Sequence, residues 1–207
     1  MKIASWRRWL VGVVLVCSLG ACVQVSIEPR ANPERRYFAL DGSGIGAAAQ
    51  ASGNGILKLA PVRVAHRYDS KGFIYRIGPD SYETDFYNHF LVAPGPMVTD
   101  ELRQVLSQAN LFQAVVDSTS LIASTHLLEG TMDELYGDFS REDAGKAVLG
   151  MSFVMREGGP DRPIIFRKRY EKTIPLQARS PEALVQGWNR ALEEMLAVLV
   201  GDLSALK

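Results

Sequence analysis

The first 22 residues constrain the fold most, because they decide which part of the chain has to fold. An apolar run from Trp9 to Cys17 follows a basic N-terminus and gives way to Leu19 and two small residues. As a helix, a run of this length rises about 14 Å, roughly half of a hydrocarbon core that is about 30 Å thick. The layout therefore predicts an export signal over residues 1–21 and not a transmembrane helix.

Leu19-Gly20-Ala21-Cys22 closes this signal and resembles the lipobox of bacterial lipoproteins. In those proteins cleavage falls before the cysteine, here between Ala21 and Cys22, and the cysteine becomes the acylated first residue. We therefore expect a covalent lipid on Cys22, with palmitate among its acyl chains, and no other cofactor. An ordinary signal peptide or an uncleaved anchor is the alternative, but either leaves the position of Cys22 unexplained.

The cysteine count fits an exported protein that folds without disulfides. The sequence holds only Cys17, within the signal, and Cys22, which a thioether would block. A chain without disulfides must rely on its hydrophobic core. Removal of the signal leaves 186 of 207 residues, which is ample for one domain and short for two.

The charge balance argues against a nucleic-acid partner. The chain has 23 basic and 23 acidic residues, and the signal takes away three basic ones, so the mature chain is slightly acidic. The densest basic segment, Arg167 to Arg169 with Arg162 and Lys172 nearby, falls in an expected strand. Alternation divides such charges between two faces of the sheet, which is unlike a continuous phosphate track.

Two segments lack the pattern of a regular element. Residues 22–34 contain two prolines and no periodicity, which predicts a flexible tether. Residues 42–55 are rich in Gly, Ala and Ser and include the spacing Gly42-x-Gly44-x-x-Ala47, which imitates a dinucleotide-binding loop. No crossover helix fits before the strand expected at Ile56, so we interpret residues 42–55 as a flexible loop.

The remaining sequence, residues 35–207, predicts one domain that mixes strands and helices. The expected strands cover residues 35–40, 56–64, 72–77, 82–92, 111–116, 126–136, 149–155 and 164–174, and the last two form a hairpin. In 82–92 alternation places Phe86, Asn88 and Phe90 on one face. Thr99 is expected to cap a first helix that stops at Asn110, and Ser180 with Pro181 to start a second. This order predicts an α/β or α+β domain with a mixed sheet.

No local motif announces catalysis or a metal site. His66, His89 and His126 stand alone, and the acidic segment 129–143 lacks the order of a calcium loop. The sequence also lacks G-x-S-x-G, the usual local sign of a serine nucleophile. We therefore expect no enzyme and no metal; a hydrolase with dispersed catalytic residues stays open as an alternative.

Three stretches resemble one known family. They are Ala60 to Leu106, the segment LEGTMDELYGDF from Leu128 to Phe139, and GWNRALEEMLAVLVGDL from Gly187 to Leu203. They are similar to the ABC-type transport auxiliary lipoproteins, the PqiC-like family, over about residues 36–203. The resemblance implies an α/β fold of three layers, with helices on both sides of a mixed sheet, like anticodon-binding-like and TolB N-terminal domains. A tyrosine stands at position 87, in a segment where some members carry a tryptophan, so the particular transporter stays open.

The resemblance also implies a function and partners. Members accompany an ABC permease and ATPase and an MCE-domain protein that move lipids or other hydrophobic compounds between the inner and outer membranes. We expect an outer-membrane location, facing the periplasm, because Val23 replaces the Asp that commonly retains lipoproteins at the inner membrane. A scaffold lipoprotein of envelope assembly is the alternative, and self-association into a homo-oligomer is left open.

A surface for the protein partner is expected in the aromatic-rich part of the chain, because aromatic and arginine side chains are enriched at binding hot spots. The candidate residues are Tyr75, Arg76, Tyr82, Tyr87 and His89. A structural role in the core is the alternative interpretation of these rings.

Overall fold

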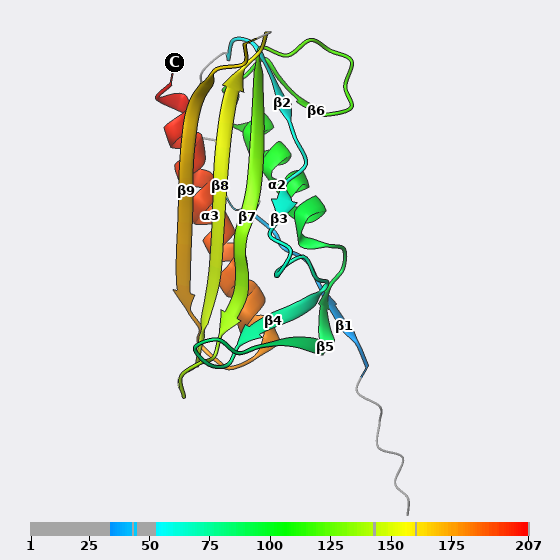
Figure 1. Ribbon diagram of the computed structural model, residues 1–207, viewed down its shortest axis with the longest axis vertical. Helices are drawn as coiled ribbons and strands as arrows, with labels where there is room; N and C mark the ends of the chain where they lie inside the picture. Colours follow the sequence, from blue (N-terminus) through cyan, green and yellow to red (C-terminus); the bar gives the residue numbers. More distant parts are fainter. Residues whose placement is uncertain (1–33, 43, 45–52, 143, 160, 207) are drawn as a thin grey trace, which may run out of the picture. The chain divides into compact units, whose positions relative to one another are not determined.

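Three long antiparallel strands form the centre of the domain: β7 (His126–Asp138), β8 (Lys146–Glu157) and β9 (Ile164–Pro175) (Figure 1). The pairing of β8 with β9 confirms the predicted hairpin. The computed structural model describes residues 34–42, 44, 53–142, 144–159 and 161–206. The expected signal, Cys22 and all of the tether except Glu34 lie outside these residues, as does most of the loop at 42–55.

Six shorter strands extend this meander on the far side of β7. They are β1 (Arg36–Phe38), β2 (Ile56–Leu59), β3 (Arg63–Val64), β4 (Gly72–Arg76), β5 (Tyr82–Phe90) and β6 (Ala114–Asp117). The order β1-β5-β4-β7-β2-β6 makes a mixed sheet, because β4 and β5 run antiparallel while β1 with β5 and β2 with β6 run parallel. The strand expected over 56–64 is divided into β2 and β3.

The C-terminal helix α3 (Pro181–Ser204) begins as the sequence predicts. The Ser180 side chain accepts a hydrogen bond from the Ala183 amide at 3.2 Å, and Pro181 occupies the first turn. Trp188, which is fully buried in the first half of the helix, packs edge-on against Phe73, with 5.1 Å between the ring centroids. Its indole Nε1 donates to two carbonyl oxygens of the sheet at 3.2 and 3.3 Å. The apolar side of α3 therefore packs on the sheet and covers the hydrophobic core there.

Helix α2 (Pro94–Gln108) starts earlier than the sequence suggested. Pro94 opens the helix, because a proline in the first turn loses no hydrogen bond there and has a helical φ. Thr99, which was expected to cap the helix, lies inside it. Its hydroxyl donates to the Gly95 carbonyl and accepts from the Val62 amide, both at 2.8 Å, so that it ties α2 to the segment between β2 and β3.

The single α/β domain with a mixed sheet and flanking helices is confirmed, but its layering differs from the expected three layers. Both helices lie behind the same face of the sheet in Figure 1. The segment before the Gly-rich loop contacts both: the Gly42 amide donates to Glu101 of α2 at 2.9 Å, and the Asp41 amide donates to Asn189 of α3 at 3.1 Å. Within the described residues, no helix is both long and apolar enough to cross a membrane.

The opposite face of β7, β8 and β9 is polar, which explains why it needs no covering helix. Glu134 pairs with Arg169 across the strands at 2.8 Å, on this open face. Lys168 and Lys172 point the other way, toward Asp202 and Glu194 of α3, at 2.5 and 2.8 Å. The predicted division of the basic segment between two faces is therefore confirmed.

Candidate functional site

The five residues predicted as a partner surface lie around the junction of β4 and β5, where the pairing of the two strands is irregular. Gly72 pairs with His89 and Ile74 with Thr84, so a step of two residues on β4 matches a step of five on β5. The extra residues of β5 bulge out of the ladder. As a result Phe86 is 62% exposed, although simple alternation placed it on the same face as the buried Asn88 and Phe90. That part of the prediction is wrong.

The carboxylate of Asp85 holds the bulge in place. It accepts hydrogen bonds from the amides of Tyr87 and Asn88 at 2.7 and 3.0 Å, from the Asn88 side chain at 2.6 Å and from the Tyr75 hydroxyl at 2.5 Å. Burial opposes the charged form, but these donors outweigh it and keep the pKa of Asp85 below its usual range. Burial, followed by the bond to Asp85, raises the pKa of Tyr75.

The same network reaches the first strand and the start of α3. Arg36 on β1 donates through Nε to the buried Asn88 side chain at 3.0 Å and also forms an ion pair with Glu182. Tyr75 is therefore a structural residue of this network rather than an exposed contact.

Arg76 and Tyr82 lie on the open face of the sheet, in a tyrosine cluster that comprises Tyr68, Tyr82 and Tyr136. The Tyr68 and Tyr136 rings stack at 5.8 Å, Tyr82 meets Tyr136 edge-on at 5.9 Å, and the Arg76 guanidinium lies 5.3 Å from the Tyr136 ring centroid. Burial raises the pKa of Tyr68 to about 12. Tyr82 remains 43% exposed, and the neighbouring Ile77 41%. This cluster offers a fixed aromatic and cationic surface.

Tyr87 and His89 lie in a third place, at the outer edge formed by β1 and β5. Tyr37 pairs with His89 across the two strands, with 6.2 Å between their ring centroids. The five predicted residues therefore occupy three sites: the buried network (Tyr75), the tyrosine cluster (Arg76 and Tyr82) and the outer edge (Tyr87 and His89).

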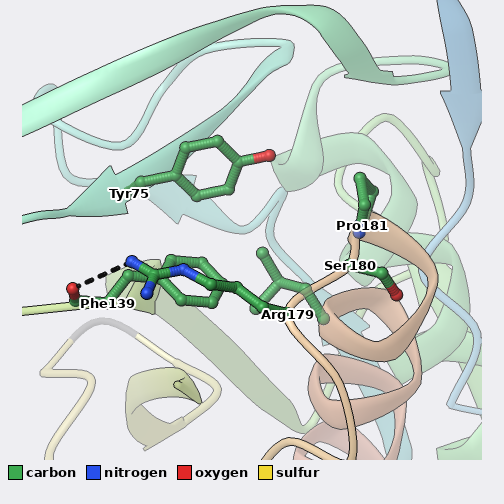
Figure 2. A pocket seen from close by; sticks show the side chains of 6 residues that line it. Tyr75, Phe139, Arg179, Ser180 and Pro181 are labelled. Atoms are coloured by element: carbon green, nitrogen blue, oxygen red, sulfur yellow. Dashed lines mark hydrogen bonds between the residues drawn. The ribbon is translucent and has the colours of Figure 1, made fainter. Parts of the chain in front are cut away.

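A pocket of about 120 Å³ opens between β4 and the start of α3 (Figure 2). Its lining residues are Tyr75, Phe139, Arg179, Ser180, Pro181 and Leu184. The Arg179 guanidinium lies 4.9 Å from the Phe139 ring centroid and donates to the Phe139 carbonyl at 3.3 Å, so it closes one side. Ligand pockets for drug-sized molecules measure about 300–1,000 Å³, so this recess is too small for a whole lipid.

Sequence reasoning missed three exposed groups of this domain. Two of them are Tyr37 and Leu91, which are 57% and 60% exposed and flank the predicted Tyr87 and His89. The third is the exposed pair Leu121 and Ile122 in the loop between β6 and β7. That loop is uncharged from Ser118 to Thr125, a signal that could have marked it. No group of three or more His, Cys, Asp or Glu side chains suited to a metal occurs among the residues that the structure describes.

Comparison with known proteins shows the fold. No family model matches the chain, and no curated protein matches its sequence. A crystal structure of a Xanthomonas campestris protein of family DUF330 has a TM-score of 0.70 at 15% identity, over 83% of this chain and 96% of that chain. An uncharacterised protein of known structure has a TM-score of 0.64 at 15% identity, over 82% and 98%. A dodecameric PelC from Paraburkholderia phytofirmans reaches only 0.44 at 14% identity, over 75% and 95%, too little to support an argument about assembly.

Proposed function

We propose that this chain is a lipid-anchored protein of the cell envelope, facing the periplasm from the outer membrane. In this proposal it is a non-catalytic auxiliary component of an ABC/MCE-type system that moves lipids or other hydrophobic compounds between the two membranes. The lipobox-like sequence that ends at Cys22 supports the anchor, and the resemblance of residues 36–203 to the transport auxiliary lipoproteins supports the role. The observation that supports the proposal most strongly is the fold, which this chain shares with the DUF330 structure over 96% of the length of that chain.

The tyrosine cluster is the surface that suits the MCE-domain partner best. Arg76 donates two hydrogen bonds to Asp138, with 3.2 Å between Nε and Oδ1 and 2.5 Å between Nη2 and Oδ2. Its guanidinium is therefore fixed before any partner binds. Tyr82 and Ile77 add exposed apolar area beside it. Aromatic and arginine side chains that are rigid in the free protein lose little entropy on binding, and they dominate many interfaces.

The proposal is tested by purification of the tagged full-length protein from native membranes in mild detergent, with the bound proteins identified by mass spectrometry. We expect an MCE-domain protein and the ABC permease and ATPase. A Tyr82→Ser variant should lose them, because it removes an exposed ring from the cluster. The matched control is Leu121→Ser, which removes an exposed apolar side chain from the β6–β7 loop and should retain them.

The other outcomes are informative. Recovery of outer-membrane assembly proteins without any MCE protein or permease would support the scaffold alternative and contradict the proposal. Loss of the partners from Leu121→Ser and not from Tyr82→Ser would keep the function but move the contact to the β6–β7 loop.

A further inference from the structure

A second exposed surface remains after the tyrosine cluster is assigned. It runs along the outer edge of β1 and β5 and consists of Arg35, Tyr37, Phe86, Tyr87, His89 and Leu91, here called the edge face. Three of its apolar side chains are more than half exposed: Tyr37 at 57%, Phe86 at 62% and Leu91 at 60%. Single exposed apolar residues are ordinary, but adjacent ones on a polar protein mark an interaction surface.

The members of the edge face touch one another. Phe86 and Tyr87 meet edge-on, with 5.2 Å between ring centroids, and the Arg35 guanidinium lies 4.6 Å from the Phe86 ring centroid. His89 connects this pair to the first strand, because its Nε2 lies 2.8 Å from the Phe86 carbonyl oxygen and its ring centroid lies 6.2 Å from that of Tyr37. The Leu91 amide donates to the Phe38 carbonyl at 2.8 Å, which fixes the backbone next to His89. The edge face is therefore one surface and not a scatter of separate side chains.

The backbone beneath this surface is well supported. Phe90 of β5 and Phe38 of β1 both pack against the buried Phe73, with 4.7 and 5.3 Å between ring centroids. The Asp85 carboxylate fixes the bulge that turns Phe86 and Tyr87 outward. The packing on Phe73 and the hydrogen bonds of Asp85 thus hold the backbone of the edge face in one conformation, in which the rings of Phe86 and Tyr87 are exposed.

The place of the edge face in the chain indicates what covers it. The described domain begins at Glu34, next to Arg35, and Cys22 lies twelve residues earlier. Twelve residues span at most about 42 Å when fully extended, so a lipid on Cys22 keeps a membrane within reach of this edge. The β6–β7 loop lies at the other end of β7, whose 13 residues span about 43 Å. The described domain thus has β1, close to its first described residue, at one end, here called the tether end, and the β6–β7 loop at the other (Figure 1).

The chemistry of the edge face also suits a membrane. Tyrosine and phenylalanine prefer the level of the headgroups, where a ring contacts acyl chains and a polar tip stays wet. Arg35, stacked on Phe86, and Lys71, whose Nζ lies 3.2 Å from the Leu91 carbonyl oxygen, bring two positive charges to this face, and such charges attract lipid phosphates. Of the acids nearby, Asp85 is turned inward to its four donors, and Glu34 is exposed at the start of the domain.

We propose that the edge face rests on a phospholipid surface, with Tyr37, Phe86 and Leu91 at headgroup level. This contact would hold the tether end against the membrane and direct the β6–β7 loop away from it. The inference rests on the lipid anchor at Cys22 of the proposed function, but not on the transport partners. It assigns the outer-edge part of the predicted partner surface to lipid and leaves the tyrosine cluster to protein.

The test uses the full-length protein, processed in cells and reconstituted into phosphatidylethanolamine and phosphatidylglycerol vesicles that contain a nitroxide-headgroup lipid. Cys17 and Cys22 offer no free thiol after processing, so an introduced cysteine carries a fluorescent label alone. One variant is Tyr87→Cys, in the edge face; its control is Ala123→Cys, exposed in the β6–β7 loop. We expect nitroxide quenching about twofold or more stronger at position 87.

A second comparison separates the face from the tether. Adding Tyr37→Ser and Phe86→Ser to the labelled Tyr87→Cys variant should reduce its quenching to the level of the control. Equal quenching at positions 87 and 123, or quenching that survives the added substitutions, overturns the proposal. Absence of quenching at 87, with crosslinks from that position to a protein in cells, overturns it in favour of a protein partner.

Mass spectrometry of the purified chain distinguishes failure of the edge-face proposal from failure of the lipid anchor at Cys22. A lipid on Cys22 without quenching at position 87 rejects the edge face alone. An unmodified Cys22 rejects the anchor and, with it, this inference.

Discussion

Arg76 at the end of β4 and Asp138 at the end of β7 form a two-pronged ion pair, with 2.5 Å between Nη2 and Oδ2 and 3.2 Å between Nε and Oδ1. The two strands run parallel and pair at this point, Arg76 opposite Asp138. The pair therefore closes the end of the sheet at which the tyrosine cluster lies. Its bidentate geometry is the stronger form of a carboxylate contact with arginine.

Loss of this pair should destabilise the domain in a pH-dependent way. The hydrogen bonds from Arg76 lower the pKa of Asp138 to about 2, so the stabilisation is complete above the ordinary pKa of an unfolded Asp, about 3.9, and fades as the pH falls toward 2. At pH 7 we expect Asp138→Asn to cost about 1–3 kcal/mol. Urea unfolding should show the difference from the wild type shrinking between pH 4 and pH 2. A difference that stays constant over that range would contradict the assignment.

Trp188 offers a second test, because removal of residues 1–21 takes away the other two tryptophans, Trp6 and Trp9. Its emission should then report the core alone and shift to longer wavelength in a single step with unfolding. Trp188→Ala should cost about 3–5 kcal/mol, as expected for a large cavity at a fully buried site. Trp188→Phe should cost less, since an aromatic ring is retained and the cavity is smaller, although the two indole hydrogen bonds are lost. Equal effects of the two variants would contradict the packing described for α3.

Two glycines of the same helix form a matched pair. A Cβ at Gly187 would lie 2.6 Å from the Ala147 Cβ of the sheet, whereas a Cβ at Gly201 would have no atom within 4 Å. We expect Gly187→Ala to destabilise by about 1–3 kcal/mol through overpacking and Gly201→Ala to stabilise by up to about 1 kcal/mol through helix propensity. Thermal unfolding of both variants measures the contrast. Similar shifts at the two positions would mean that α3 does not approach the sheet so closely at Gly187.

The anchor at Cys22 is tested in cells by metabolic labelling with a clickable fatty acid. We expect label on the wild type and none on Cys22→Ser, because the thioether and the acylated amine both depend on that residue. Each buried methylene adds about 0.8 kcal/mol of membrane affinity, so the wild type should stay with membranes. Density fractionation should place it with the outer membrane. Label that survives Cys22→Ser, or fractionation with the inner membrane, would contradict the anchor or the location respectively.

The elements of this domain could be predicted where the local signal is strong. The strict alternation from Leu149 to Met155 and the Ser180-Pro181 start gave β8 and α3 their correct places. The start of α2 was missed because Thr99 was expected to cap the helix, although a proline such as Pro94 also begins helices well. In all three elements the prediction depended on residues that are neighbours in the sequence.

The outer edge and the layering could not be predicted in the same way. Alternation assumes a regular ladder, and the bulge held by Asp85 breaks the ladder of β5, so Phe86 faces out. The Asp85 contact with Tyr75 joins two strands, and only the folded register shows it. Likewise, the ion pairs that let one face of the sheet stay uncovered, such as Glu134 with Arg169, depend on strand register.

The most direct test of the proposed function is site-specific photo-crosslinking from Tyr82 in whole cells, with Ile122 of the β6–β7 loop as the matched position. Both side chains are exposed and apolar, at 43% and 52%, so they differ chiefly in location. The account predicts a crosslink from position 82 to an MCE-domain protein and none to it from position 122. Crosslinks from position 82 to envelope assembly proteins alone would contradict the proposed function, and a crosslink to the MCE-domain protein from position 122 and not from position 82 would contradict the assigned contact surface.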